Sequence, residues 1–466
     1  MLKRTALLLL TAFLTVSLLA QPQAKYVFYF IGDGMGVNQV IGTEQYNRAT
    51  GKGPAEINFN HFPVRVFITT ESDNSLVTDS AAAGTALATG VKTYNDAVGV
   101  DPDGKPVTSV TEWAHAAGRG TGIATTVGVN HATPAAFSAH TARRGNYDDI
   151  ALQQIKAPVD FLAGGGFITR RSSGHDAAFY EQEAVRAGIS LFRGPGFTGV
   201  SATDGRVLCL SGTPQNDLPY AIDRKEGDTA LSDFVKAGIG YLETHFCEEG
   251  FFFMIEGGKI DYGGHGNDAA ACFQEVTDMA ESVDLALSFL ERHPGETLIL
   301  VTADHETGGL MLGAGEYKMN PERLAWQDGS ATVLTDLFRD AFFPDEKAYK
   351  APTWEAVKAF FAQHLGLWEH VDVPAEAEAS LREVYIQTFG ENGDRHLGKA
   401  NLYSVNAKLV DEAIRIVDNA AGFRFSFGSH SGSPVGLYVT GAGSETFTAV
   451  KDNAEIAPLI AKVAGY

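Results

Sequence analysis

Three apolar runs in this chain are each followed closely by an acidic residue. The runs occupy residues 26–31, 251–255 and 298–302, and the acids are Asp33, Glu256 and Asp304. Aromatic and β-branched residues dominate these runs, which predicts buried strands. In an open, largely parallel sheet the carboxyl ends of the strands share one edge, where ligands bind. Carboxylates gathered there repel one another unless a cation compensates their charge, so the pattern indicates a metal site.

Helical and strand patterns alternate through much of the sequence. Further strand candidates occupy residues 64–69 and 122–127, and helical stretches of small residues occupy 80–89, 110–117 and 269–290. This alternation predicts an α/β fold with a mostly parallel central sheet. Residues 311–422 differ, because their charged sequence with scattered aromatic residues predicts a mostly helical insertion without a clear buried strand. After it, the chain is expected to return to the sheet.

Histidines and a further acid accompany the acids that follow the strands. Asp261 and His265 stand in the glycine-rich stretch EGGKIDYGGHGND, His305 adjoins Asp304, and His430 lies among small residues in GSHSGSP. Imidazole and carboxylate together favour zinc, whereas an all-oxygen set favours magnesium. Any one of these histidines is compatible with a surface or core role, but the combination favours metal binding.

A candidate nucleophile stands at the start of a helix of small residues in VTDSAAAGTALATG. Ser80 begins that predicted helix, where backbone N–H groups and the positive end of the helix dipole attract anions. The simpler alternative is that Asp79 or Ser80 only caps the helix. Beside a zinc ion, the serine is a plausible nucleophile for covalent catalysis.

The charge balance limits the partners of the chain. Thirty-six Lys and Arg residues against 57 Asp and Glu residues give a formal net charge of -21. A broad binding surface for nucleic acid or for an anionic membrane is therefore not expected. An anionic substrate would have to be held by local cations.

The N-terminal sequence predicts export. A basic start is followed by an apolar run of about 15 residues, shorter than the roughly 20 that a spanning helix needs. Residues 1–22 are therefore predicted to be a signal peptide, with a membrane anchor as the alternative, and residues 23–466 to form the exported domain. A periplasmic or secreted location follows. Cys209, Cys247 and Cys272 allow one disulfide at most, match no compact zinc-thiolate spacing, and are expected to be buried structural residues.

Six sequence blocks resemble the alkaline phosphatase family. They are GDGMG at 32–36, TDSAAAGTA at 78–86, NHATPAAFSAH at 130–140, EGGKIDYGGH at 256–265, TADHETGG at 302–309 and GSH at 428–430. The blocks follow the order found in the family, which makes the combined match specific. The resemblance implies a three-layer α/β sandwich, a homodimer, and hydrolysis of phosphate monoesters through a phosphoserine intermediate at a two-zinc centre.

The resemblance also assigns roles to individual residues. It implies one zinc held by Asp261, His265 and His430, a second held by Asp33, Asp304 and His305 beside Ser80, and a magnesium held by Asp33, Thr133 and Glu256. Arg144 falls at the family's substrate arginine, whose guanidinium can bind two phosphoryl oxygens. Arg143 is the alternative, because an error of one residue in the alignment would exchange the two.

Two further positions are expected near the substrate. The enterobacterial enzyme carries Asp and Lys where this chain has His131 and Tyr262, and animal enzymes resemble the chain at His131. A neutral phenol in place of a lysine removes a positive charge beside the bound phosphate. The resemblance therefore implies an altered phosphate affinity and magnesium dependence.

Other functional classes fit the sequence less well. Dinucleotide binding is disfavoured because Val37 replaces the third glycine of GxGxxG, and a serine esterase because Ser80 lacks the GxSxG elbow. The closer alternatives are a phosphodiesterase of the same superfamily, a sulfatase, and a non-catalytic secreted protein that binds metal or phosphate. The presence of every proposed ligand together with Ser80 favours a phosphomonoesterase.

Overall fold

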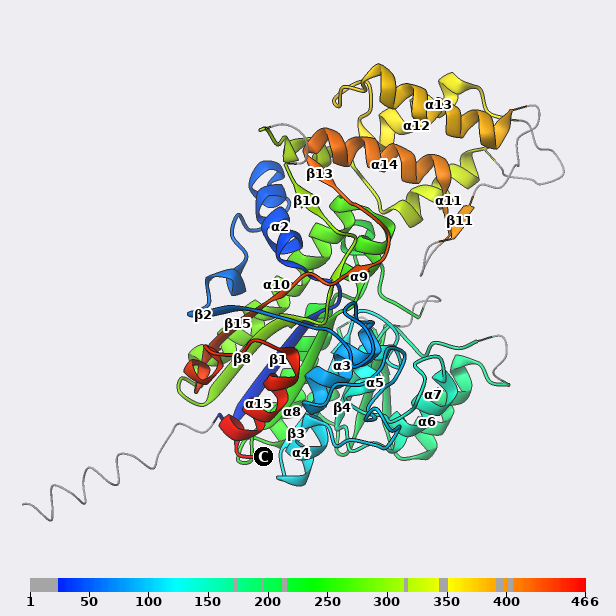
Figure 1. Ribbon diagram of the computed structural model, residues 1–466. Helices are drawn as coiled ribbons and strands as arrows, with labels where there is room; N and C mark the ends of the chain where they lie inside the picture. Colours follow the sequence, from blue (N-terminus) through cyan, green and yellow to red (C-terminus); the bar gives the residue numbers. More distant parts are fainter. Residues whose placement is uncertain are drawn as a thin grey trace, which may run out of the picture.

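A nine-stranded sheet forms the centre of the computed structural model (Figure 1). The structure describes residues 24–170, 174–194, 196–211, 216–313, 317–342, 351–390, 398–400 and 405–466. The strands are β1 (Tyr26–Gly32), β2 (Val64–Ile68), β3 (Gly120–Thr125), β4 (Phe161–Gly164), β5 (Ser190–Arg193), β6 (Val207–Leu210), β7 (Phe251–Gly257), β8 (Thr297–Ala303) and β15 (Val435–Gly441). Their order across the sheet is β2-β15-β8-β1-β7-β3-β4-β6-β5. Strand β15 is antiparallel to both its neighbours, and every other ladder of this sheet is parallel.

Helices cover both faces of the sheet. They are α2 (Val37–Thr50), α3 (Ser80–Thr89), α4 (Val110–Ala116), α5 (Ala132–Ala136), α6 (Tyr147–Lys156), α7 (Ala177–Arg186), α8 (Leu231–His245), α9 (Lys259–Gly266), α10 (Ala269–Arg292) and α15 (Ile456–Ala464). Helices α8 and α10 pack against one face, and α4, α5 and α15 against the other. Side-chain alternation supports both contacts, since Phe28 packs against Phe289 of α10, whereas Tyr29 packs against Phe137 beside α5. The result is a three-layer α/β sandwich.

The predicted α/β class and mostly parallel sheet are confirmed. The five predicted strands lie within two residues of β1, β2, β3, β7 and β8, and the three predicted helices correspond equally well to α3, α4 and α10. Strands β4, β5 and β6 were not predicted, because each has only four residues and gives a weak periodic signal. Strand β15 lies in the segment that was expected to return to the sheet.

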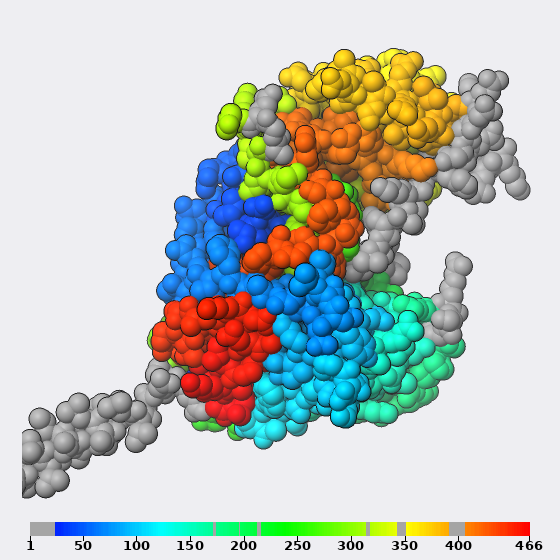
Figure 2. Space-filling view, viewed as in Figure 1, coloured from blue at the N-terminus to red at the C-terminus, as the bar shows by residue number. Residues whose placement is uncertain are grey.

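A separate helical unit lies between β8 and β15 in sequence. It contains α11 (Ala331–Phe342), α12 (Trp354–Leu365), α13 (Ala375–Phe389) and α14 (Lys408–Ala421), together with the short strands β11 (Gly398–Ala400) and β12 (Val405–Ala407). Figure 1 shows it in yellow and orange beyond the sheet, and Figure 2 shows it as a distinct lobe. Its buried residues form a second hydrophobic cluster, which extends to Tyr46 of α2 and Phe273 of α10. The unit is therefore anchored on the helices that follow β1 and β7.

The predicted signal peptide, residues 1–22, lies outside the described residues. Within the described part of the chain, no helix combines the length and the apolar character needed to cross a bilayer. Cys209, Cys247 and Cys272 carry free thiols. Cys209 and Cys272 are buried as expected, but Cys247 is exposed, because it follows the end of α8 in a loop.

The second cluster predicts that alanine substitutions at two adjacent residues of α11 differ strongly in their effect on the free energy of unfolding. Phe338 is fully buried and stacks against Phe361, whereas 41% of the surface of Leu337 is exposed. Phe338→Ala should lower the free energy of unfolding by about 3–5 kcal/mol through lost burial and a residual cavity. Leu337→Ala should change it by about 0.5 kcal/mol or less. Urea unfolding measures both; equal effects would contradict this assignment of the core.

Candidate active site

The three acids that follow the apolar strands lie together, as the sequence predicted. Strand β1 runs between β8 and β7, and Gly32 at its end is in register with the last residues of both neighbours. Asp33 and Asp304 therefore emerge from adjacent strands at the same level, and Glu256 is the penultimate residue of β7. All three side chains are fully buried.

Two of these acids and a histidine form a first candidate metal group. The ligand atoms of Asp33, Asp304 and His305, here called the His305 group, all lie within 4.8 Å of one another. His305 Nε2 lies 3.2 Å from Asp304 Oδ2 and 3.5 Å from Asp33 Oδ1. Ser80 Oγ lies 3.2 Å from the same ring nitrogen. The predicted nucleophile thus faces the His305 group.

The helix cap beside Ser80 is supplied by another residue. Asp79 Oδ1 accepts a hydrogen bond of 3.0 Å from the backbone N–H of Ala82, which caps α3. Ser80 is fully buried, and its hydroxyl is not needed for the cap. Of the two capping alternatives that the sequence left open, the structure selects Asp79.

A second candidate metal group comes from α9 and the C-terminal part of the chain. The ligand atoms of Asp261, His265 and His430, the His430 group, lie within 4.8 Å of one another. The Nδ1 atoms of His265 and His430 lie 2.8 and 2.9 Å from the carbonyl oxygens of Gly428 and Thr78, to which they can donate. If each ring donates from Nδ1 in this way and is neutral, its Nε2 atom carries a lone pair. The two Nε2 atoms lie 3.1 Å apart, so these lone pairs face each other. A metal ion satisfies both nitrogens.

A third group surrounds Glu256. Asp33, His131 and Glu256, the Glu256 group, also have ligand atoms within 4.8 Å of one another. Thr133, which the sequence analysis assigned to magnesium, is buried on α5 two residues after His131, and its hydroxyl acts to lower the pKa of Glu256. His131 was expected near the substrate; it also stands where it could complete a metal site.

The structure distinguishes the two arginines. Arg144 donates from Nη1 to Asp79 Oδ2 at 3.2 Å, and its Nη2 lies 3.2 Å from His131 Nε2. Arg143 instead pairs with Asp96, and 75% of its side chain is exposed. Arg144 therefore lies beside His131 at the candidate site, whereas Arg143 does not. Tyr262 on α9 packs edge-on against the His131 ring, with 6.2 Å between the ring centroids.

Burial raises the pKa of each acid at the strand ends. The pKa of Asp33 and that of Asp304 lie well above the ordinary value, because burial disfavours their charge and neighbouring acids repel it. Burial raises the pKa of Glu256 to about 7. Burial lowers the pKa of His305 and of His131 well below the ordinary value, so both rings favour the neutral form that binds metal.

The donor set fits divalent metal ions. Both carboxylate oxygens of Asp33, Oε1 of Glu256, Oδ2 of Asp261 and Oδ2 of Asp304 are buried and accept no hydrogen bond. Native proteins seldom leave so many buried acceptors unsatisfied at one place. Mixed nitrogen and oxygen donors in the His305 and His430 groups suit zinc, and the oxygen-rich surroundings of Glu256 suit magnesium.

Sequence reasoning missed two hydroxyl groups that contact residues of the candidate metal groups. Thr307 Oγ1 donates to Asp261 Oδ1 at 2.5 Å and lies 3.2 Å from His305 Nδ1, so it connects the His430 group with the His305 group. Thr125, at the end of β3, donates to Glu256 Oε2. Thr307 lies within the TADHETGG block and could have been found there, whereas Thr125 depends on the pairing of β3 with β7.

In the metal-free protein, ionisation of Glu256 should lower stability as the pH rises from about 5 to about 8. The folded pKa of Glu256, about 7, exceeds the unfolded value, so the folded state binds more protons and loses stability as they dissociate. Thermal unfolding of chelated protein across this range measures the effect. Glu256→Gln, which cannot ionise, should reduce the slope; an equal slope in both proteins would contradict the assignment.

Comparisons with known proteins identify the family of this chain. The alkaline phosphatase family profile matches residues 24–167 and 206–466. Alkaline phosphatase 4 of Bacillus subtilis (strain 168) is 30% identical over 457 residues, covering 95% of this chain and 89% of the relative. The cold-active alkaline phosphatase of a psychrophilic Shewanella sp. superposes with a TM-score of 0.76 at 28% identity, covering 94% of this chain and 99% of its own.

A thermophilic structure gives the same result. The alkaline phosphatase of Thermus thermophilus superposes with a TM-score of 0.75 at 26% identity, covering 95% of this chain and 92% of its own. The profile leaves residues 168–205 unmatched, which include α7 and β5 at the far edge of the sheet from β2. The family match over most of the chain shows that this protein belongs to the alkaline phosphatase family and is a phosphomonoesterase.

Proposed function

We propose that this phosphomonoesterase works through a phosphoserine on Ser80, at a centre of two zinc ions and one magnesium ion. The observation that carries the proposal is the position of Ser80 Oγ, 3.2 Å from His305 Nε2 and free of the helix cap. Asp33, Asp304 and His305 would hold one zinc, and Asp261, His265 and His430 the other. Glu256, Asp33 and Thr133 would hold the magnesium, with His131 beside them.

The reaction consists of two displacements at phosphorus. Ser80 Oγ bonds to phosphorus while the bond from phosphorus to the alcohol oxygen breaks, and the alcohol leaves with a proton. A water oxygen then attacks phosphorus, the bond from phosphorus to Ser80 Oγ breaks, a proton from the water returns to Ser80 Oγ, and inorganic phosphate leaves. Two inversions give net retention at phosphorus. Bound zinc would lower the pKa of the Ser80 hydroxyl and stabilise the leaving oxygen.

Arg144 provides the cation that the acidic chain needs locally. Its guanidinium, fixed by Asp79, can donate to two phosphoryl oxygens at once. A monoester offers more free oxygens than a diester, so this arrangement favours monoesters over the alternative of a phosphodiesterase. Tyr262 and His131 would line the same phosphate site. We also propose that the signal peptide directs export of the protein and that the exported protein assembles into a homodimer.

The first test is phosphate release from an aryl phosphate monoester at mildly alkaline pH. Chelation should abolish activity, and zinc with magnesium should restore it. Ser80→Ala should lower turnover at least about a thousandfold with metal content retained, because the nucleophile is lost and the stronger ligands remain. Ser75→Ala removes a hydroxyl from the same loop and should act like wild type. Near-normal turnover of Ser80→Ala would exclude the phosphoserine route.

His430 tests the zinc assignment separately. His430→Ala removes one nitrogen from the His430 group, so elemental analysis should show one zinc fewer per chain, and excess zinc should restore part of the activity. His364→Ala, in α12, removes a histidine that pairs with Asp328 and should leave zinc content unchanged. An unchanged zinc content in His430→Ala would remove His430 from the site.

A further inference from the structure

Both ring nitrogens of His140, four residues before Arg144, face hydrogen-bond acceptors. Its Nδ1 lies 2.7 Å from the carbonyl oxygen of Gly99, and its Nε2 lies 3.3 Å from Glu112 Oε1. Both partners are acceptors, so both bonds form together only when each ring nitrogen carries a proton. The geometry thus favours an imidazolium. Consistently, the hydrogen bond that the ring makes to Glu112 raises the pKa of His140.

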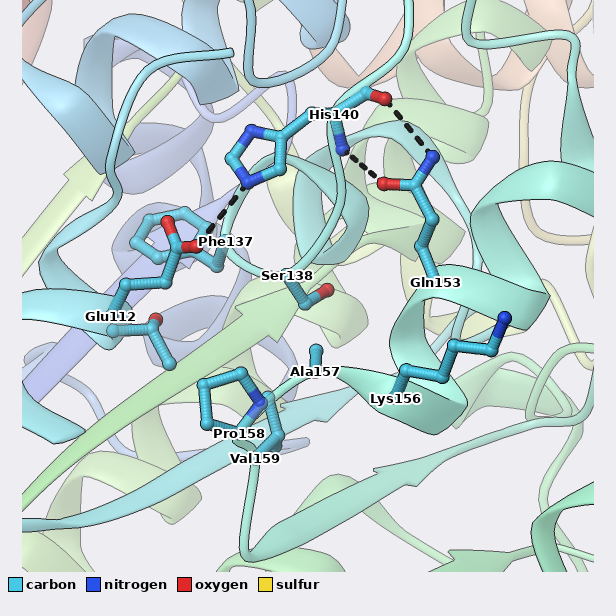
Figure 3. Close-up of a pocket in the computed structure, with 10 residues that line it drawn as sticks. Glu112, Phe137, Ser138, His140, Gln153, Lys156, Ala157, Pro158 and Val159 are labelled. Carbon is cyan, nitrogen blue, oxygen red and sulfur yellow. Dashed lines mark hydrogen bonds and ion pairs between the residues drawn. The ribbon is translucent and has the colours of Figure 1, made fainter. Parts of the chain in front are cut away.

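The backbone of His140 is held as firmly as its ring. Its N–H donates to Gln153 Oε1 at 2.8 Å, and Gln153 Nε2 donates to its carbonyl oxygen at 3.0 Å, as Figure 3 shows. Glu112, on α4, is fixed in turn by the backbone N–H of Ser109 in a capping box. The His140 ring and backbone therefore connect α4 with α6 beside a cavity of about 210 Å³.

The segment held in this way leads directly to Arg144. Thr141 exchanges backbone hydrogen bonds of 2.8 and 2.9 Å with Val98, and the N–H of Arg144 donates to the carbonyl oxygen of Asp96 at 2.6 Å. Residues 139–144 thus lie along residues 96–99, joined by an isolated antiparallel bridge between Val98 and Thr141 and by the bond from Arg144 to Asp96. The chain approaches so closely at Gly99, where φ is +61°, that a Cβ there would lie 2.2 Å from the Ala139 carbonyl oxygen.

We propose that His140, paired as an imidazolium with Glu112, is a positioning residue that fixes the segment carrying Arg144 and thereby sets the affinity for phosphate. The proposal rests on the phosphate-binding role of Arg144 given above. Lys156 lines the same cavity but points away from His140 in Figure 3, and Asp149 bonds to Gln153, so Glu112 is the acid that faces the ring.

The test is a double-mutant cycle on the metal-loaded enzyme. The KM for an aryl phosphate and the inhibition constant of inorganic phosphate are measured for wild type, His140→Gln, Arg144→Ala and the double variant. Gln can donate to one acceptor but not to both, so His140→Gln should raise both constants about tenfold. In the Arg144→Ala background it should add less than about a twofold change, because the residue acts through Arg144.

The pH dependence separates an imidazolium from a merely structural ring. A raised folded pKa means that the ion pair is complete at low pH and is lost as pH rises through that pKa. The ratio of the phosphate inhibition constants, His140→Gln over wild type, should fall toward one between about pH 6 and pH 10. Ionisation of phosphate itself cancels in this ratio. A ratio independent of pH would overturn the proposal.

Controls keep the possible outcomes distinct. Thr353→Ala weakens the cap of α12 in the helical unit, so it should lower the melting temperature and leave phosphate inhibition unchanged. If His140→Gln fails to fold, Glu112→Gln, which keeps the shape but removes the charge, should give the same rise at low pH. If His140→Gln raises the KM and the phosphate inhibition constant by the same factor with and without Arg144, His140 does not act through Arg144 and the proposal is refuted. Unchanged constants in Arg144→Ala alone would refute the arginine's role, and the present proposal with it.

Discussion

Burial of several carboxylates at one edge of the sheet is the constraint on which the site depends. Asp33, Glu256 and Asp304 are placed by the register of three neighbouring parallel strands, at or just beyond the strand ends, and all three are fully buried. In a buried environment such groups neutralise or acquire a counterion. The packing that stabilises the sheet therefore also buries the carboxylates, and bound metal ions would compensate their charge.

The anion-binding side of the site depends on a single acid in a similar way. Asp79 accepts hydrogen bonds from the backbone of α3 and from the N–H of Asp96, and it pairs with Arg144. One carboxylate thus fixes the start of the helix that carries Ser80 and the guanidinium that would bind the phosphoryl group. Because Asp79 performs the capping, the neighbouring serine hydroxyl is available for chemistry.

Local sequence patterns predicted most of the structural framework and the gathering of three acids at one edge of the sheet. Apolar runs ending in acids indicate both the strands and their functional edge, because strand character and its termination are local properties. The four-residue strands β4, β5 and β6 escaped prediction since they form only through pairing with one another and with β3. The same limit applies to Thr125, whose role arises from a neighbouring strand, and to the choice between Arg143 and Arg144, which depends on contacts with residues 79 and 96.

The helical unit lies in sequence between two residues of the candidate site, His305 and His430, and leaves them close together. The chain leaves the sheet after His305 through β9 (Glu306–Thr307) and β10 (Met311–Leu312) and returns through β13 (Phe423–Arg424) and β14 (His430–Ser431). Two short antiparallel ladders join these segments, β10 with β13 and β9 with β14, and the second sets His430 opposite Thr307. The two ladders close the inserted segment at its base and hold His430 beside His305. The entropic cost of closing such a loop grows only slowly with the number of residues in it. The site therefore constrains the positions of the two ends of the unit, and it places no such constraint on the length of the segment between them.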